Sequence, residues 1–313
     1  MRAAERQRVL GDDAFAHLRE VRAARPGEIR AALGRRIRRP LLSGDGRLFI
    51  VAADHPARGA LGVGADAMAM ADRYDLLDRL ALALSRPGVD GVLATPDLID
   101  DLALLGALDG KIVVGSMNRG GLRGASFELD DRFTAYDVEA MTRDRLDFAK
   151  TLLRIDLDDP GTLATLEATA RAVDEAARAE LPIMLEPFVS GRRDGRVVND
   201  LTADAVIRSV AIASGLGRSS AYTWLKLPVV PEMERVMSAT TLPTLLLGGE
   251  PDGDPEAAYR GWEHALTLPG VRGLVVGRTL LYPADGDVAT AVDQAAAIVH
   301  GPDHADEPNG ARS

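Results

Sequence analysis

The 313-residue chain contains no cysteine, so it can form no disulfide, no thiolate nucleophile and no cysteine-ligated metal site. Aromatic residues make up only 4%, which disfavours the base-stacking platforms of single-strand nucleic-acid binders. The formal net charge of −10 also argues against a nucleic-acid surface. No run of about 18 apolar residues indicates a membrane span, and the Arg-rich start lacks the apolar core of a signal peptide. We therefore expect a cytoplasmic protein with neither nucleic-acid nor membrane partners.

Lysine is the scarcest charged residue, and only three of the 37 basic residues are lysines, namely Lys111, Lys150 and Lys226. Two of them, Lys150 and Lys226, lie inside apolar, strand-like runs. Arginine cannot replace lysine where an amine must attack a carbonyl and form an imine, because a guanidinium stays protonated whereas a desolvated amine can lose its proton. An arginine-biased composition that left a few lysines at random explains the scarcity equally well, so the order of the other motifs must decide.

Eight short apolar runs alternate with helical patterns along the chain, and they are continuous in apolar character, as strands buried on both faces should be. Such alternation over about 250 residues predicts an α/β protein of the closed (β/α)8 (TIM) barrel type, with a doubly wound open sheet as the alternative. No G-x-G-x-x-G motif follows the first run, which weakens the interpretation that the chain is a dinucleotide-binding open sheet. The predicted strands cover 48–54, 89–95, 111–115, 149–155, 181–186, 222–227, 242–249 and 271–277, and the predicted helices cover 66–85, 97–108, 160–180, 201–214, 255–268 and 287–300.

Three regions follow from this pattern. Residues 1–46 are Arg-rich and helical in pattern, and we expect an N-terminal helical extension that covers the barrel floor or a subunit contact. Residues 47–300 form the predicted barrel, which is the catalytic domain. Residues 301–313 are polar and rich in glycine, proline and acidic side chains, which predicts a disordered tail.

Charged residues fall where a barrel of this type carries its chemistry, at the C-terminal ends of its strands. Asp54 ends the first predicted strand, Glu186 ends the fifth, and Lys150 and Lys226 lie in the fourth and sixth. Buried charges are costly unless they are paired, so function explains this set better than folding does. For each carboxylate the alternative is capping of a neighbouring helix or loop. His55, next to Asp54, is interpreted as a residue that supports the site rather than reacts.

Glycines and an arginine lie at the ends of the last two predicted strands. The seventh ends in Gly248 and Gly249, and the eighth ends in Gly277 and Arg278. Barrels commonly bind phosphate at the loops after these two strands. Glycine lets the backbone approach phosphate oxygens closely, and Arg278 can add a charge-assisted contact. The two ends together predict a phosphate site.

Six segments in order resemble class I aldolases of the group that includes tagatose-1,6-bisphosphate aldolase and the archaeal-type fructose-bisphosphate aldolases. The resemblance spans residues 48–299. The chain also resembles an actinobacterial family of aldolase-like barrel proteins, some of them linked with myo-inositol catabolism. The segments that carry it are Ala53-Asp54-His55, Ala149-Lys150-Thr151, Leu181-Pro182-Ile183-Met184-Leu185-Glu186-Pro187, Leu225-Lys226-Leu227-Pro228, Leu247-Gly248-Gly249 and Val276-Gly277-Arg278.

The resemblance implies a lyase that forms a Schiff base with a sugar phosphate and needs neither a metal nor another cofactor. Lys226 is expected to form the imine, and Glu186 to move protons. Asp54 is expected to hold substrate hydroxyls or share the proton transfers, and Lys150 to favour the unprotonated amine of Lys226 through like-charge repulsion. Proteins of this group usually assemble, so a homo-oligomer is expected.

Two segments depart from the aldolase pattern. The first strand is followed by Asp-His-Pro-Ala-Arg-Gly, and the third by Asn118-Arg119-Gly120-Gly121-Leu122-Arg123. Arg119 and Arg123, with Asn118 beside them, could bind a substrate carboxylate. That would suit a keto-acid sugar phosphate such as 6-phospho-5-dehydro-2-deoxygluconate. Solvated loop charges are an equally good interpretation of both arginines.

Three other functions remain open. A thiolase or transaldolase would use the same lysine. A phosphosugar isomerase or epimerase would bind phosphate without an imine. A catalytically silent barrel would serve as a binding or regulatory subunit, although such a barrel has no reason to retain two buried lysines.

Overall fold

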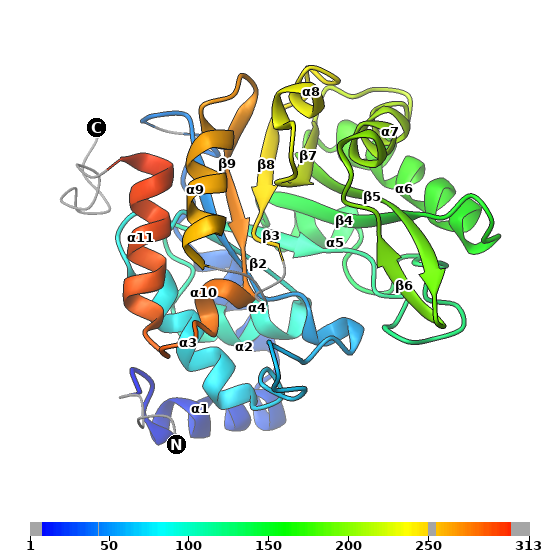
Figure 1. Cartoon of the computed structure of the whole chain (residues 1–313). Coiled ribbons are helices and arrows are strands. Elements are labelled where there is room, and N and C mark those ends of the chain that lie inside the picture. The colour runs from blue at the N-terminus through cyan, green and yellow to red at the C-terminus, as the bar shows by residue number, and fades with distance from the viewer. Residues whose placement is uncertain (1–7, 43, 250–254, 302–313) are drawn as a thin grey trace.

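The computed structural model describes residues 8–42, 44–249 and 255–301. Eight parallel strands close into a barrel with helices around it, which confirms the (β/α)8 prediction over the open sheet (Figure 1). Around the barrel the order is β1, β2, β3, β4, β5, β7, β8 and β9, and β9 pairs back onto β1. The strands are β1 Leu48–Ala52, β2 Gly91–Ala94, β3 Ile112–Ser116, β4 Phe148–Ile155, β5 Ile183–Arg193, β7 Thr223–Pro228, β8 Thr244–Leu247 and β9 Val271–Val276.

A cluster of apolar side chains fills the inside of the barrel. Ile50, Val114, Phe148, Met184 and Trp224 all belong to it, and the rings of Phe148 and Trp224 meet edge to face with centroids 5.4 Å apart. A second, larger cluster lies between the strands and the surrounding helices. The strands are therefore buried on both faces, which is why they are continuous in apolar character rather than alternating.

The six predicted helices are present and differ from prediction only at their ends, whereas three short helices at 138–143, 233–237 and 278–281 were not predicted. The helix predicted from residue 66 begins only at Arg73, because the Asp72 side chain accepts the N–H groups of Tyr74 and Asp75 and caps it there. The helix predicted to reach residue 108 ends earlier, and Gly106 follows with φ +69. Within the described residues no helix is long and apolar enough to cross a membrane. The helices are α3 Arg73–Ser85, α4 Pro96–Leu104, α5 Val138–Arg143, α6 Gly161–Arg178, α7 Ala203–Ser214, α8 Met233–Met237, α9 Pro255–Leu266, α10 Arg278–Leu281 and α11 Val288–His300, with a 3-10 turn η1 at Pro56–Arg58.

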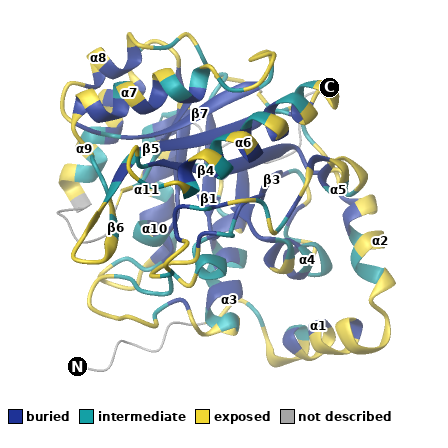
Figure 2. Cartoon of the chain, turned by 90° about the vertical axis from the view of Figure 1, so that its right-hand side faces the viewer, coloured by how far each residue is buried: buried dark blue, intermediate teal, exposed yellow. Residues whose placement is uncertain are grey.

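The N-terminal extension begins with two helices, α1 Asp12–Ala24 and α2 Gly27–Arg35. They lie outside the barrel against α3 and α4, where Phe15 stacks on Tyr74 at a ring distance of 4.4 Å (Figure 1). Much of their outer surface is exposed, whereas the strands are buried (Figure 2). The helices therefore do not cover the barrel floor.

The segment after α2 does cover the floor. Arg36 forms an ion pair of 2.9 Å with Asp147, which precedes β4. Arg39 pairs with Asp90, which precedes β2, and Leu41 packs against the apolar cluster inside the barrel. The expected role of the N-terminal region thus belongs to residues 36–42. The predicted tail from residue 302 onward lies outside the described residues.

A hairpin that was not predicted from the sequence extends beyond the barrel. Strand β5 continues to Arg193 and pairs with β6, Arg196–Asn199, in antiparallel register (Figure 1). Asp194 and Gly195 form the two-residue turn, with φ +49 and φ +75. Asp-Gly is a strong sequence signal for this kind of turn, and it was overlooked.

His300, the last residue of α11, joins that helix to the barrel floor. Its Nδ1 lies 2.8 Å from Asp45 Oδ2, and its Nε2 lies 3.1 Å from Asp90 Oδ2. Burial disfavours the charged ring, but the hydrogen bond and charge of Asp90, with those of Asp45, outweigh it and raise the pKa of His300. The ring is therefore protonated more readily in the folded chain than in the unfolded one.

This linkage predicts a loss of stability at alkaline pH. A group with a raised folded pKa stabilises the fold below its unfolded pKa, about 6.5, and loses that contribution as the pH rises through the folded value. His300→Gln should cost about 2 kcal/mol of unfolding free energy at pH 6, and less at pH 9. Urea unfolding of both proteins at the two pH values measures this. Equal losses at the two pH values would contradict it.

Candidate active site

The four predicted catalytic residues form one continuous chain of ion pairs. The amino group of Lys150 lies 2.9 Å from Asp54 Oδ2 and 2.6 Å from Glu186 Oε2. The amino group of Lys226 lies 2.7 Å from the other oxygen of Glu186, Oε1. All four residues are buried, and none is more than 8% exposed. Charges that the chain separates by up to 172 positions thus converge on one point, with Glu186 between the two lysines.

The strands position these side chains by simple alternation. Lys150 follows Phe148 by two residues, Glu186 follows Met184, and Lys226 follows Trp224. Because side chains two apart on a strand share a face, each charged residue points to the inside of the barrel, next to an inward apolar residue. The apolar cluster forms the floor of the site, and the charged residues lie nearer the C-terminal ends of the strands.

The pairing fixes the charge state of three of these groups. Burial disfavours the ammonium of Lys150, but the charges of Asp54 and Glu186 outweigh it and raise the pKa of Lys150. Burial also opposes ionisation of the two acids, yet the charge of Lys150, together with that of Lys226, outweighs burial and holds the pKa values of Asp54 and Glu186 below their usual range. At neutral pH the site therefore holds two carboxylates and a protonated Lys150.

Direct repulsion between the amino groups of Lys150 and Lys226 was expected, but the structure places the Glu186 carboxylate between them. Glu186 places one carboxylate oxygen on each amino group, so its negative charge lies between them. Within the part of the chain that the structure describes, Lys150 has two carboxylate partners, whereas Lys226 has one. This difference separates the roles that the two lysines can take.

Two further side chains contact Asp54. Ser116 at the end of β3 donates a hydrogen bond of 3.3 Å to Asp54 Oδ2. His55 Nδ1 lies 3.9 Å from Asp54 Oδ1, and that buried nitrogen has no hydrogen-bond partner among the described residues. Burial lowers the pKa of His55 to about 4, so its ring is neutral at neutral pH. His55 is thus a neutral neighbour of the ion-pair chain, in agreement with the supporting role expected for it.

The glycines and the arginine of the predicted phosphate site follow neighbouring strands, β8 and β9. Gly249 has φ +75, which glycine adopts without strain. A Cβ on Gly277 would lie 2.3 Å from the Ala52 carbonyl oxygen, so close packing alone requires a glycine there. Arg278 opens α10, and its Nη1 lies 3.4 Å from the Gly62 carbonyl oxygen. Gly248 precedes Gly249 at the end of β8, and residues 250–254 lie outside the described part of the chain.

The loop after β3 separates Asn118 from the two arginines. The Asn118 amide accepts the Leu152 N–H at 2.8 Å and donates to the carbonyl oxygens of Leu152 and Asp131. These bonds occupy its polar atoms and tie the loop to β4, so we leave Asn118 out of any phosphate site. Arg123 is exposed. Arg119 is half-buried and lines a cavity.

Sequence reasoning missed a network that holds this loop. Arg58 forms an ion pair of 2.5 Å with the buried Asp131 and donates to the carbonyl oxygens of Asn118 and Gly121. Arg154 on β4 adds an ion pair of 2.7 Å with Glu128. The two segments that depart from the aldolase pattern therefore contact each other. The acidic residues that follow Arg123 are the sequence feature from which this network could have been predicted.

The fold is a (β/α)8 barrel with a buried lysine–carboxylate site toward the C-terminal ends of its strands. The chain belongs to the Cgl0159-like family, whose model matches residues 46–296. The crystal structure of Cgl0159 from Corynebacterium glutamicum is similar at 67% identity and a TM-score of 0.92, covering 94% of this chain and 99% of that one. A search of curated proteins finds no match.

Fructose-bisphosphate aldolases share the fold at low identity. An archaeal fructose 1,6-bisphosphate aldolase is 20% identical with a TM-score of 0.60, covering 87% of this chain and 99% of that one. The enzyme from Slackia heliotrinireducens is 14% identical with a TM-score of 0.62, covering 94% and 90%. At these identities the likeness shows a common barrel.

Proposed function

We propose that this protein is a class I aldolase that makes or cleaves a C–C bond in a ketose phosphate through a Schiff base on Lys226. One observation carries the proposal, the buried chain of Asp54, Lys150, Glu186 and Lys226 at the C-terminal ends of the strands. Such a set has no structural need, because apolar residues of similar volume would stabilise a barrel at least as well. A Schiff-base-forming fructose-1,6-bisphosphate aldolase shares the fold, which supports the same chemistry.

Lys226 is the better nucleophile of the two lysines. Lys150 lies between two carboxylates that raise its pKa and keep it protonated. Lys226 shares one carboxylate, and Glu186 Oε1 is 2.7 Å from its nitrogen, within reach to accept the proton that the amine must lose. The protonated Lys150 then holds Asp54 and Glu186 in place and keeps the site electrically balanced.

The reaction follows from these positions. The amine of Lys226 attacks the substrate ketone, and loss of water from the carbinolamine gives a protonated imine. A carboxylate, Glu186 by preference, removes the proton of the hydroxyl on the β carbon, which is the far carbon of the bond to be broken. That bond cleaves to an aldehyde while its electron pair enters the imine as an enamine. Protonation of the enamine and addition of water release the ketone product and free Lys226.

The ends of β8 and β9 are the proposed phosphate site. Gly248, Gly249 and Gly277 offer backbone close to the substrate, and Arg278 offers a cation. His55 lies between this end and the ion-pair chain, since a Cβ on Gly277 would be only 3.3 Å from His55 Cε1. The neutral ring can therefore lie beside a bound phosphate without adding charge.

Borohydride trapping tests the proposal. The protein is incubated with dihydroxyacetone phosphate and reduced, and the adduct is mapped by peptide mass spectrometry. We expect one adduct, on Lys226. No adduct, with unchanged ligand binding in a folded Lys226→Ala variant, would exclude the class I aldolase and leave an isomerase or a binding subunit. Product analysis separates an aldolase from a transaldolase or thiolase that uses the same lysine.

A further inference from the structure

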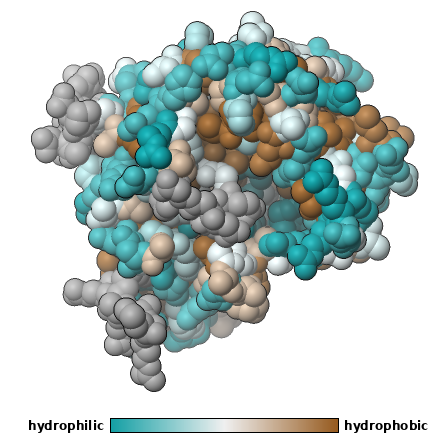
Figure 3. All heavy atoms as spheres, viewed as in Figure 1, coloured by the Kyte–Doolittle hydropathy of each residue, from teal (hydrophilic) through white to brown (hydrophobic). Residues whose placement is uncertain are grey.

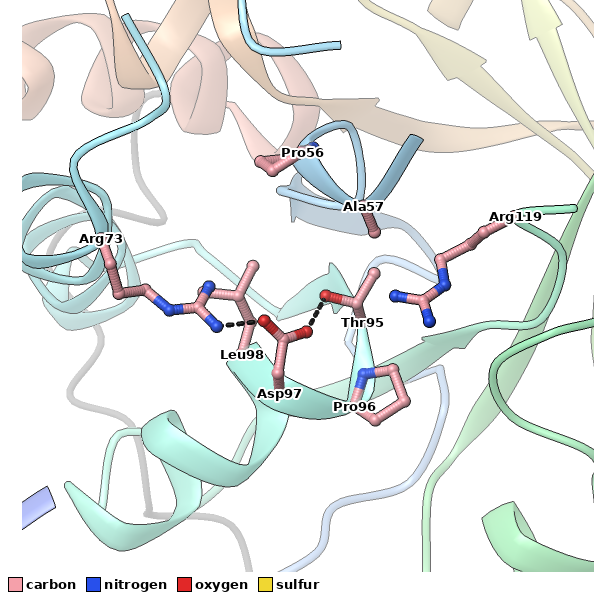
Figure 4. Close-up of a pocket in the computed structure, with 8 residues that line it drawn as sticks. All are labelled: Pro56, Ala57, Arg73, Thr95, Pro96, Asp97, Leu98 and Arg119. Atoms are coloured by element: carbon pink, nitrogen blue, oxygen red, sulfur yellow. Dashed lines mark hydrogen bonds and ion pairs between the residues drawn. The ribbon is translucent and has the colours of Figure 1, made fainter. Parts of the chain in front are cut away.

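A cavity of about 280 Å³ opens on the catalytic face of the barrel, over the ends of β1, β2 and β3 (Figure 4). Pro56 and Ala57 of η1 line it on the β1 side, Thr95 on the β2 side and Arg119 on the β3 side. None of these residues belongs to the ion-pair chain or to the proposed phosphate site. The cavity lies at the same end of the strands as Lys226, since every lining residue except Arg73 comes within five positions of the end of β1, β2 or β3.

Three charged side chains line this cavity, Arg73, Asp97 and Arg119, and the opposite charges of Arg73 and Asp97 compensate each other. Arg73 pairs with Asp97, and its Nε lies 3.5 Å from Asp101 as well. The Thr95 hydroxyl donates to Asp97 Oδ1 at 2.5 Å. Burial opposes ionisation of Asp97, but this hydrogen bond and the charge of Arg73 outweigh it and lower its pKa. The wall of the cavity at α3 and α4 is therefore electrically balanced.

Arg119 is the charged group of this cavity whose charge is not compensated by an ion pair within the described residues. Its Nη2 donates one long bond of 3.4 Å to the Thr134 carbonyl oxygen, and its Nε is buried without a hydrogen-bond partner. No carboxylate of the described residues forms an ion pair with it. Figure 4 shows its guanidinium directed past Ala57 toward Thr95. A guanidinium has five N–H donors, and among the described residues only Nη2 of Arg119 has a hydrogen-bond acceptor.

We propose that this cavity binds a carboxylate of the substrate through Arg119, at the end of the carbon chain opposite the phosphate. The inference rests on the proposed function and names its substrate class, a keto-acid sugar phosphate. A planar guanidinium matches a carboxylate with two parallel hydrogen bonds.

The charge balance favours a carboxylate over a second phosphate. One uncompensated positive charge on Arg119 neutralises one carboxylate. A phosphate dianion would leave excess negative charge beside Asp97, which is itself ionised.

The order of strands supports the same arrangement. The phosphate site lies at β8 and β9, and the cavity lies at β2 and β3. In the closed barrel these two pairs are separated by β1 on one side, and by β4, β5 and β7 on the other. A substrate with its phosphate at β8 and β9 and its carboxylate at Arg119 can lie over the mouth of the barrel, where Lys226 and Glu186 lie. The ketone reaches Lys226 while the carboxylate rests on Arg119.

The aldol addition direction tests the cavity. Dihydroxyacetone phosphate is offered with succinate semialdehyde, with butyraldehyde and with glyceraldehyde 3-phosphate, and kcat/KM is measured for each aldehyde. We expect the carboxylated aldehyde to be preferred over the neutral one. Arg119→Gln should lower kcat/KM for the carboxylated aldehyde about 10- to 100-fold and leave butyraldehyde unchanged. Arg123→Gln, on an exposed arginine of the same loop, is the matched control and should change neither.

Trapping and calorimetry separate the possible failures. Borohydride adducts of dihydroxyacetone phosphate on Lys226 should be equal in Arg119→Gln and wild type. Calorimetric binding of succinate semialdehyde should weaken in Arg119→Gln and not in Arg123→Gln, and this readout needs no imine. If no adduct forms but that binding holds, the aldolase proposal fails and the cavity stands. Equal losses for all three aldehydes, or an Arg119-dependent preference for the phosphorylated one, would overturn the carboxylate.

Discussion

Lys226→Arg is expected to lower kcat/KM for the aldol reaction by on the order of 10⁴-fold, with no borohydride adduct. The arginine keeps a positive charge beside Glu186, so the ion-pair chain remains balanced. What it loses is the ability to become a neutral amine, because a guanidinium stays protonated in proteins. The rate of dihydroxyacetone phosphate release in a coupled assay, together with trapping, measures both effects.

The two other lysines provide the controls. Lys111 is also buried, and burial lowers its pKa to about 8. Its amino group donates a hydrogen bond of 2.6 Å to the Val89 carbonyl oxygen. Val89 precedes β2 and Lys111 precedes β3, so this contact lies at the end of the barrel opposite the catalytic face. Lys111→Arg should therefore retain near-normal rates. Lys150→Arg should keep the adduct on Lys226 at a reduced rate. Substantial activity in Lys226→Arg would favour an isomerase that forms no imine.

The catalytic candidates were predictable because barrel strands encode position simply. Once a run is identified as a buried strand, its C-terminal end and its inward face follow from a period of two. That places Asp54, Lys150, Glu186 and Lys226 in one mouth before any coordinates exist. What the pattern could not supply is how they share charge. That Glu186 lies between both lysines depends on rotamers and on the stagger of β4, β5 and β7.

The loops were much less predictable. Arg58 and Asp131 lie 73 positions apart and meet only because both loops leave the same end of the barrel. Local periodicity carries no information on such a pair. Arg119 shows the same limit in a different way. From the neighbouring sequence, a solvent-exposed charge and a ligand-binding charge were equally good interpretations of Arg119. The cavity that it lines and the lack of a hydrogen-bond partner for its Nε favour the second. The early start predicted for α3 failed for a local reason, the cap at Asp72.

Glu186→Gln is expected to cost both activity and stability. Loss of the proton acceptor 2.7 Å from Lys226 should lower kcat about 10²- to 10⁴-fold. The same change leaves two lysines with only Asp54, so one buried positive charge has no compensation. Removing one partner of a buried pair typically costs about 3–5 kcal/mol. Urea unfolding at pH 7 and single-turnover kinetics measure the two losses.

The acid limb gives the sign of the effect. The folded pKa of Glu186 lies below its ordinary value, so its contribution is present above the unfolded pKa, about 4.3, and is lost as the pH falls through the folded one. The wild type should thus lose stability below about pH 5, and Glu186→Gln should lose less. Glu128→Gln, which removes the buried carboxylate paired with Arg154, is the matched control. It should be destabilised but keep the Lys226 adduct.

A double variant separates charge balance from catalysis. Lys226→Met combined with Glu186→Gln leaves Asp54 and Lys150 as one neutral pair, at 2.9 Å. Its stability should therefore exceed that of Glu186→Gln alone, although neither the adduct nor the activity can return. A positive coupling of this kind is what contact between two buried charges produces. If the two substitutions instead destabilise additively, and Glu186→Gln alone unfolds like the wild type at every pH, then Glu186 does not hold the charges of this site together.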